Sequence, residues 1–99
     1  MPDIHSIRLR EPWICEPRED CVCWIRTFNW PAGLTPREKV WIVVEELPAG
    51  ARVSLNGQLL VDDLEVTKLI ALTNRLEIEL PGARAGERPF QVRLDIDEG

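Results

Sequence analysis

The chain has 99 residues, which is enough for one domain with a single hydrophobic core. Its 17 acidic residues outnumber its 12 lysines and arginines, so the formal net charge is −5. This charge argues against nucleic acids and anionic membranes as partners, because both bind basic surface patches. The sequence has no apolar run as long as a transmembrane helix, and its first ten residues lack the apolar core of a signal peptide. We therefore expect a cytoplasmic protein if Met1 is the native first residue.

Three strands separated by loops are predicted in the N-terminal half. Apolar residues alternate with arginines over Ile4–Arg10, which favours a strand. A polar loop is expected over residues 14–20, followed by a second strand over Cys21–Phe28, which is rich in β-forming residues. A loop with two prolines and one glycine then spans residues 31–36. The nearly continuous apolar run Lys39–Leu47 favours a central strand buried on both faces.

A β-hairpin is predicted next. Val53 and Leu55 alternate with polar residues, as in a half-buried strand. Asn56 and Gly57 follow, and this pair favours a type I′ turn, in which both central residues have positive φ. Residues 58–61 are then expected to form the returning strand.

The rest of the chain predicts two clean strands. Residues Glu65–Ile70 indicate a strand end followed by a helical turn. Apolar and polar residues alternate strictly over Asn74–Leu80 and again over Phe90–Ile96. Seven strands with regular turn signals and no convincing helix predict one all-β domain over residues 1–99, an antiparallel β-sandwich.

Three motifs in this half follow a pattern known from one family. Val53–Gly57 matches a V-x-L-N-G hairpin, Leu64–Ile70 an F-D-[IV]-T-x-L-[IL] segment, and Asn74–Leu80 an N-x-L-x-[IV]-x-[VL] strand. In this order they resemble the jelly-roll, galactose-binding-like domain that binds sugar in family 2 glycoside hydrolases. Leu64 and Glu65 replace the usual Phe-Asp, and the chain is shorter than those domains. The resemblance implies jelly-roll topology with seven to eight strands and a non-catalytic, carbohydrate-binding role, since catalysis in those enzymes belongs to a separate barrel domain.

Four tryptophans are candidates for stacking on a sugar ring or a protein partner. Trp24 and Trp41 lie inside predicted strands, so core packing is the better interpretation for both. Trp30 lies where a strand runs into the proline-rich loop and is the best candidate for exposure, although packing under its own loop is the simpler alternative. Trp13 is intermediate. The candidate ligand-binding residues are therefore Trp30, Trp13 and Asn29, which precedes Trp30.

Three cysteines lie within nine positions and leave three alternatives open: Cys15, Cys21 and Cys23. They can be small packing residues, a disulfide from Cys15 to either of the others, or part of a metal site. A structural zinc site usually needs four ligands, and His5 is the only histidine. Because thiols stay reduced in the cytosol, we favour packing and expect no metal and no cofactor.

The resemblance to modules of glycosidases makes paired carboxylates candidates for acid–base chemistry. Glu77 and Glu79 share one face of a strand at about 6–7 Å, near the range of an acid–base pair. Arg75 stands beside them, so a solvated polar face is the better interpretation. Asp62 and Asp63 have no spacing typical of a calcium loop.

No nucleophile set and no phosphate-binding glycine loop is present in the sequence. We therefore expect a protein that is not an enzyme but a non-catalytic binding or interaction module, with carbohydrate binding implied by the resemblance. The alternative is a stand-alone structural β-sandwich that associates with itself and has no small-molecule ligand.

Overall fold

The computed structural model describes residues 4–30, 37–61, 64–82, 86 and 88–97. Within these residues the chain forms eight strands and no helix. Their bounds are β1 (Ile4–Arg8), β2 (Ile14–Pro17), β3 (Cys21–Asn29), β4 (Lys39–Glu45), β5 (Arg52–Leu55), β6 (Gln58–Leu60), β7 (Thr73–Pro81) and β8 (Gln91–Asp97). The predicted all-β class is confirmed.

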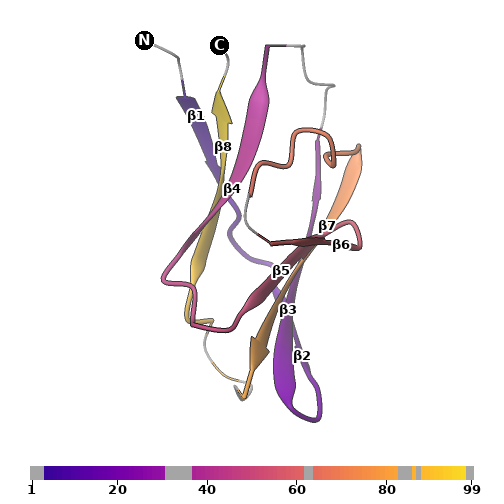
Figure 1. The fold of residues 1–99 in the computed structure, drawn as a ribbon, viewed down its shortest axis with the longest axis vertical. Coiled ribbons are helices and arrows are strands. Elements are labelled where there is room, and N and C mark those ends of the chain that lie inside the picture. The colour runs from indigo at the N-terminus through magenta and orange to yellow at the C-terminus, as the bar shows by residue number, and fades with distance from the viewer. Residues whose placement is uncertain (1–3, 31–36, 62–63, 83–85, 87, 98–99) are drawn as a thin grey trace.

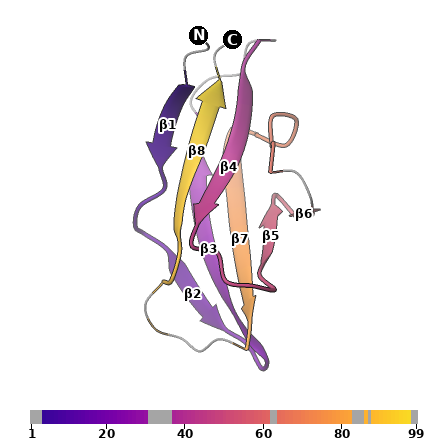
Figure 2. The ribbon, with the colours of Figure 1, turned by 60° about the vertical axis from the view of Figure 1, so that its left-hand side comes forward.

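The strands form two antiparallel sheets that share one hydrophobic core (Figures 1 and 2). One sheet has the order β1-β8-β4 and the other the order β2-β3-β7-β5-β6. Alternate residues of each strand point inward, which is why the clean alternation of β7 and β8 predicted their buried faces correctly. The inner faces contribute Val40, Ile42, Val92, Leu94 and Ile96 from the first sheet, and Val22, Trp24, Val53, Leu55, Leu76, Ile78 and Leu80 from the second. This arrangement is a β-sandwich.

Asn56 and Gly57 form the predicted hairpin turn between β5 and β6. Their φ angles are 52° and 85°, so both central residues have the positive φ that a type I′ turn requires. Leu55 pairs with Gln58 across the turn, and β5 continues the sheet by pairing with β7. The hairpin therefore forms one end of the five-stranded sheet.

The segment after the hairpin returns to the first sheet. Glu65 forms a single bridge with Trp41 of β4. On either side of it, Ile42 N donates to Leu64 O at 2.9 Å and Val66 N donates to Val40 O at 2.7 Å. The chain then turns, with Leu69 N donating to Val66 O at 2.8 Å. The predicted strand end and turn are confirmed, and this segment lies beside β4.

The predicted polar loop over residues 14–20 is wrong in its first half. Ile14–Pro17 is a strand that pairs antiparallel with Val22–Ile25 of β3. Its burial is low because it lies at the edge of the sheet. Pro17 is compatible with this strand because β2 is an edge strand, in which one row of backbone N–H groups has no partner in the ladder.

The prediction that the strand starting at Lys39 is buried on both faces is also wrong. Val40 and Ile42 are buried, whereas Trp41 and Val43 are only half-buried on the opposite face. No described element covers that outer face of the three-stranded sheet. Trp41 is therefore not a core residue, in contrast to Trp24, which is.

The proline-rich loop at 31–36 and the Asp62-Asp63 pair lie outside the described residues. In the part of the chain that is described, no helix has the length and apolar character needed to cross a membrane.

Candidate ligand-binding groove

At one edge of the five-stranded sheet, β2 covers only part of the length of β3. The short strand β2 pairs only with Val22–Ile25 of β3. The rest of β3, Arg26–Asn29, pairs with β7 on one side, and no described strand lies on its other side. In Figure 2, β1 and β2 both lie along this edge of the sandwich, with β1 above the point where β2 is missing. The two sheets are therefore open to solvent at this corner.

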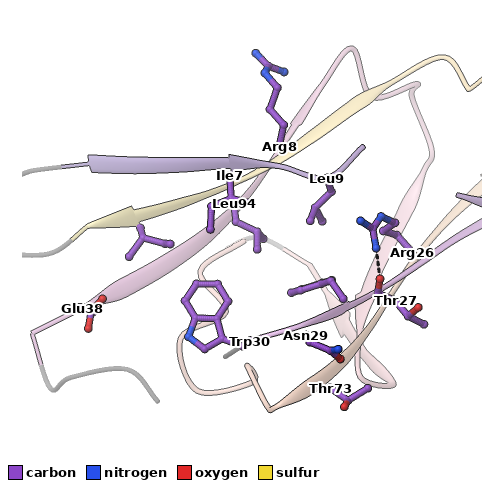
Figure 3. Close-up of a pocket in the computed structure, with 12 residues that line it drawn as sticks. Ile7, Arg8, Leu9, Arg26, Thr27, Asn29, Trp30, Glu38, Thr73 and Leu94 are labelled. Atoms are coloured by element: carbon purple, nitrogen blue, oxygen red, sulfur yellow. Dashed lines mark hydrogen bonds between the residues drawn. The ribbon is translucent and has the colours of Figure 1, made fainter. Parts of the chain in front are cut away.

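A groove of about 680 Å³ occupies this corner, a volume typical of small-molecule sites. It lies between the inner side of β1 and β8 and the unpaired end of β3 (Figure 3). We call it the edge groove. Its apolar lining residues are Ile7, Leu9, Phe28, Trp30, Leu94 and Ile96, and its polar ones are Arg8, Arg26, Thr27, Asn29, Glu38 and Thr73.

Trp30, one of the three predicted ligand-binding residues, lines the edge groove. Its side chain is half-buried and packs against the core, so part of the indole remains accessible. The backbone N–H of Trp30 donates to Leu72 O at 2.9 Å, which fixes the end of β3 against the chain that enters β7. Figure 3 shows the indole in the space between the two sheets. Trp30 is thus held in place by the fold and presents an aromatic surface.

Asn29 lines the edge groove at its rim. Because neighbouring residues of a strand point to opposite faces, its side chain lies on the outer side of β3. Figure 3 shows it directed away from β1, and the residue is exposed. Asn29 can therefore reach the outer part of a ligand but not the floor of the groove.

Trp13, the third predicted site residue, is outside the edge groove. Only 8% of it is exposed, and its Nε1 donates to Leu9 O at 2.9 Å. Its ring meets the Phe90 ring edge-on at 5.5 Å, and Arg88 Cζ lies 4.8 Å from the ring centroid. The indole is therefore enclosed by neighbours and offers no face to a ligand.

Arg26 lines the edge groove and was not among the predicted site residues. It lies on the inward face of β3, after Val22 and Trp24 and before Phe28. Its Nε donates to Arg10 O at 2.7 Å, and Nη1 donates to Thr27 O. The sequence does hold a signal for it, because Arg26 is a charged residue that interrupts an otherwise apolar inward series.

The three cysteines are free thiols, and Cys15 lies on the opposite face of the sheet from Cys21 and Cys23. Cys15 is paired with Trp24 and contacts the core, whereas Cys23 faces outward between Glu16 and Glu79. Burial raises the pKa of the Cys23 thiol, against the opposing effect of the Arg18 guanidinium. Neither of the two disulfides considered for Cys15, to Cys21 or to Cys23, is present in this structure. No group of three possible metal ligands occurs among the described residues.

Glu77 and Glu79 lie on the outer face of β7, on a different part of the molecule from the edge groove. Arg75 Nε is 2.6 Å from Glu77 Oε1, and Arg18 Nη1 is 3.3 Å from Glu79 Oε2. Both carboxylates remain partly exposed and each has an arginine partner, as on a solvated polar face.

The edge groove thus combines an apolar floor, one indole and one guanidinium, which suits binding by stacking and hydrogen bonding. Comparisons of this chain with models of known protein families, with curated proteins and with solved structures found no match.

Proposed function

We propose that this protein is a non-catalytic binding module whose edge groove binds a carbohydrate. The observation that carries the proposal is the position of Trp30 and Arg26, which lie on the same wall of an open groove between the two sheets. The expected cytoplasmic location and the exclusion of nucleic acid remain part of this proposal.

The chemistry of the wall supports a sugar ligand. A sugar ring has an apolar C–H face, which packs on an aromatic ring, and hydroxyl groups, which need directed hydrogen bonds. Trp30 supplies the aromatic surface and the Arg26 guanidinium supplies donors, with Asn29 and Thr27 at the rim. A ligand that is apolar on one face and polar around its edge fits this distribution better than a wholly apolar one.

The strand order supports the expected jelly roll, and with it the resemblance to sugar-binding domains. Each of three strand pairs encloses the next along the chain, because β1 pairs with β8, β3 with β7, and β5 with β6. The bridge between β4 and Glu65 adds a further level to this nesting. A double-sheet jelly roll built from two Greek keys has such nested pairings.

A binding role rather than a catalytic one is proposed because of the acidic groups. Among the described residues that line the edge groove, Glu38 is the single carboxylate. Most glycosidases use two carboxylates that flank the scissile bond. Glu77 and Glu79 are on the outer face of β7, so they do not complete such a pair at the groove.

A sugar titration tests the proposal. The protein, labelled with ¹⁵N, is titrated with a panel of neutral and acidic oligosaccharides while the four indole N–H signals are followed by NMR. We expect the Trp30 signal to shift with at least one saccharide, and Trp30→Ala to weaken that binding about tenfold, as loss of one aromatic anchor commonly does. Trp41→Ala is the matched control, because Trp41 is also half-buried but lies on the outer face of the other sheet. Unchanged indole signals across the whole panel, from a folded protein, would refute carbohydrate binding.

Self-association is the second candidate, favoured by one observation. Edge strands β1 and β2 lie on the same side of the sandwich and expose Ile4 (62%), Ile7 (39%) and Ile14 (61%). Exposed apolar edge strands pair readily with another chain. Light scattering after size exclusion tests this candidate: a dimer that Ile14→Lys converts to a monomer supports it, and a monomeric wild-type protein at high micromolar concentration rejects it.

A further inference from the structure

Arg26 differs from the other arginines that the structure describes. Six of them form ion pairs with carboxylates: Arg8, Arg18, Arg52, Arg75, Arg88 and Arg93. Arg10 and Arg37 are exposed to water, which solvates their charge. Arg26 is half-buried, and no carboxylate among the described residues pairs with it. A partly buried cation is usually matched by an anion, so the missing partner is informative.

The backbone holds the Arg26 guanidinium in one orientation. Nε donates to Arg10 O at 2.7 Å and Nη1 donates to Thr27 O. A guanidinium has five N–H donors. Two of the five are used by these carbonyls, so three remain for a ligand in the edge groove. Carbonyl oxygens orient the cation but do not neutralise it.

For an anionic ligand at Arg26, attraction to the guanidinium at short range outweighs repulsion by the net negative charge of the protein. The net charge of −5 repels anions at long range, but salt screens such effects beyond about 8–10 Å. Leu9 and Phe28 are apolar members of the same lining, and apolar neighbours that exclude water strengthen a contact ion pair. An anion that reaches Arg26 therefore meets a favourable partner, whereas Glu38, which also lines the groove, disfavours an anion placed next to it.

The spacing along β3 sets the size of the ligand. Arg26 and Trp30 are four residues apart, and both line the groove. At about 3.3 Å per residue their Cα atoms are roughly 13 Å apart. A ligand that touches both side chains is longer than a single sugar ring.

We propose that the edge groove binds an oligosaccharide that contains a uronic acid, with the carboxylate on Arg26 and a neighbouring ring on Trp30. A carboxylate can accept two parallel hydrogen bonds from a guanidinium, which gives both strength and direction. This inference rests on the proposed carbohydrate binding and names the class of sugar that the same groove takes.

Matched ligands test the inference. Affinities are measured by calorimetry for oligogalacturonate and oligoglucuronate, for the methyl ester of each, and for neutral glucose and galactose oligomers. Methyl esterification removes the negative charge and leaves the sugar ring unchanged. We expect at least one uronate to bind about tenfold more tightly than its methyl ester, as for one charge-assisted hydrogen-bonded pair.

Variants assign the effect to Arg26. Arg26→Gln is expected to weaken binding of the uronate much more than binding of its ester, so that the preference for the uronate is lost, and Arg26→Lys is expected to keep part of the preference. Arg52→Gln is the matched control, because Arg52 lies outside the edge groove and its Nη1 is 3.8 Å from Glu79 Oε1. It removes the same charge and should leave the preference intact. Thermal unfolding of each variant checks that it is folded.

The possible failures are distinct. If no saccharide of either kind binds, the proposed function itself is overturned. If neutral oligomers and methyl esters bind as tightly as uronates, carbohydrate binding stands and the uronate inference is overturned. An equal loss of the preference in Arg52→Gln and Arg26→Gln also overturns it, because the effect then reflects net charge rather than the Arg26 contact.

Discussion

Asn56 Nδ2 donates to Asn74 Oδ1 at 3.0 Å and joins the hairpin turn to the start of β7. Asn74 is only 1% exposed, and its side chain also bonds the backbone of Ala71 in both directions, at 2.8 Å each. Asn56 Oδ1 accepts from the backbone N–H of Arg75 at 2.8 Å. Two asparagines that the sequence explains separately as turn residues, one exposed and one buried, thus form one polar network.

Removal of the Asn74 amide should destabilise the fold. Asn74→Ala leaves the N–H and C=O of Ala71 without their partner, and polar groups left unpaired away from water cost about 1–3 kcal/mol. These two bonds are partly buried, so water can compensate for part of the loss. We expect a loss of about 2–3 kcal/mol in the free energy of unfolding, measured with urea. Asn29→Ala is the control, because Asn29 is exposed, and it should change stability by less than about 0.5 kcal/mol. Equal stability of the two variants would contradict the role of the network.

Arg88 should stabilise the packing of Trp13 on the core. Its side chain is 11% exposed, Nη1 donates to Phe90 O at 2.8 Å, and the guanidinium lies over the Trp13 ring. We expect Arg88→Met, which keeps an apolar stem, to lose about 1–2 kcal/mol of unfolding free energy in urea. Nε of Arg88 is buried without a hydrogen-bond partner among the described residues, which offsets part of the stabilisation.

The control for Arg88 is Arg52→Met. Arg52 is largely exposed and lies 3.8 Å from Glu79, a distance at which a surface pair contributes little. A loss for Arg88→Met no larger than that for Arg52→Met would show that the contact with Trp13 does not contribute.

Asp95 should make stability depend on acid pH. Burial acts to raise the pKa of Asp95, but hydrogen bonds from the Ser6 hydroxyl, at 2.7 Å, and from Arg93 Nε, at 3.0 Å, outweigh it. The pKa of Asp95 therefore lies below its ordinary value. A carboxyl group whose pKa is lowered by folding contributes stability in full above its unfolded-state pKa, and this contribution is lost as the pH falls through the folded-state pKa.

Comparison of Asp95→Asn with the wild type measures this contribution. Near neutral pH we expect the variant to be less stable by about 1 kcal/mol, because the charged acceptor is lost. The difference should shrink as the pH falls below the ordinary range for aspartate, where the wild-type carboxylate takes up its proton. Urea unfolding at a series of pH values provides the data. A difference that stays constant down to the lowest pH would exclude the carboxylate as its source.

Cys23 should react slowly with thiol reagents. It is 1% exposed, and burial raises the pKa of its thiol, so little thiolate is available. At about pH 8 we expect alkylation of Cys23 to be at least about tenfold slower than that of the half-buried Cys21, measured by mass spectrometry of the peptides. In denaturant all three cysteines should react at similar rates. Fast reaction of Cys23 in the native protein would contradict its burial.

Strands with strong local patterns could be predicted from the sequence, and the edge strand β2 could not. Alternation within β7 and β8 is enough to locate their inner faces. Ile14–Pro17 lacks such a pattern, and it is a strand because β3 provides a partner. β4 shows the converse, since Trp41 and Val43 are apolar on an outer face and make a one-sided strand look buried on both sides.

For the candidate site, the exposure of a residue could be predicted only where neighbouring residues in the sequence determine it. Trp30 stands at a strand end before a proline-rich stretch, and this position alone indicates partial exposure. The burial of Trp13 depends on Phe90 and Arg88, which are more than seventy positions away in the chain. The edge groove exists because β2 is shorter than β3 and leaves part of β3 unpaired. The length of β2 is determined by its pairing with β3, and the periodicity of the sequence does not reveal it.

The segment that connects β1 to β2, residues 9–13, passes from one sheet to the other, and we call it the crossing. Its contacts have a thermodynamic consequence for ligand binding. Trp13 Nε1 and Arg26 Nε hold it by donating to Leu9 O and Arg10 O, and Arg26 faces the groove as well. Because one guanidinium contacts both the crossing and the ligand, occupancy of the groove and order in the crossing are reciprocally linked. Ligand binding should therefore slow amide hydrogen exchange in the crossing, and substitutions that loosen the crossing should lower affinity by the same factor.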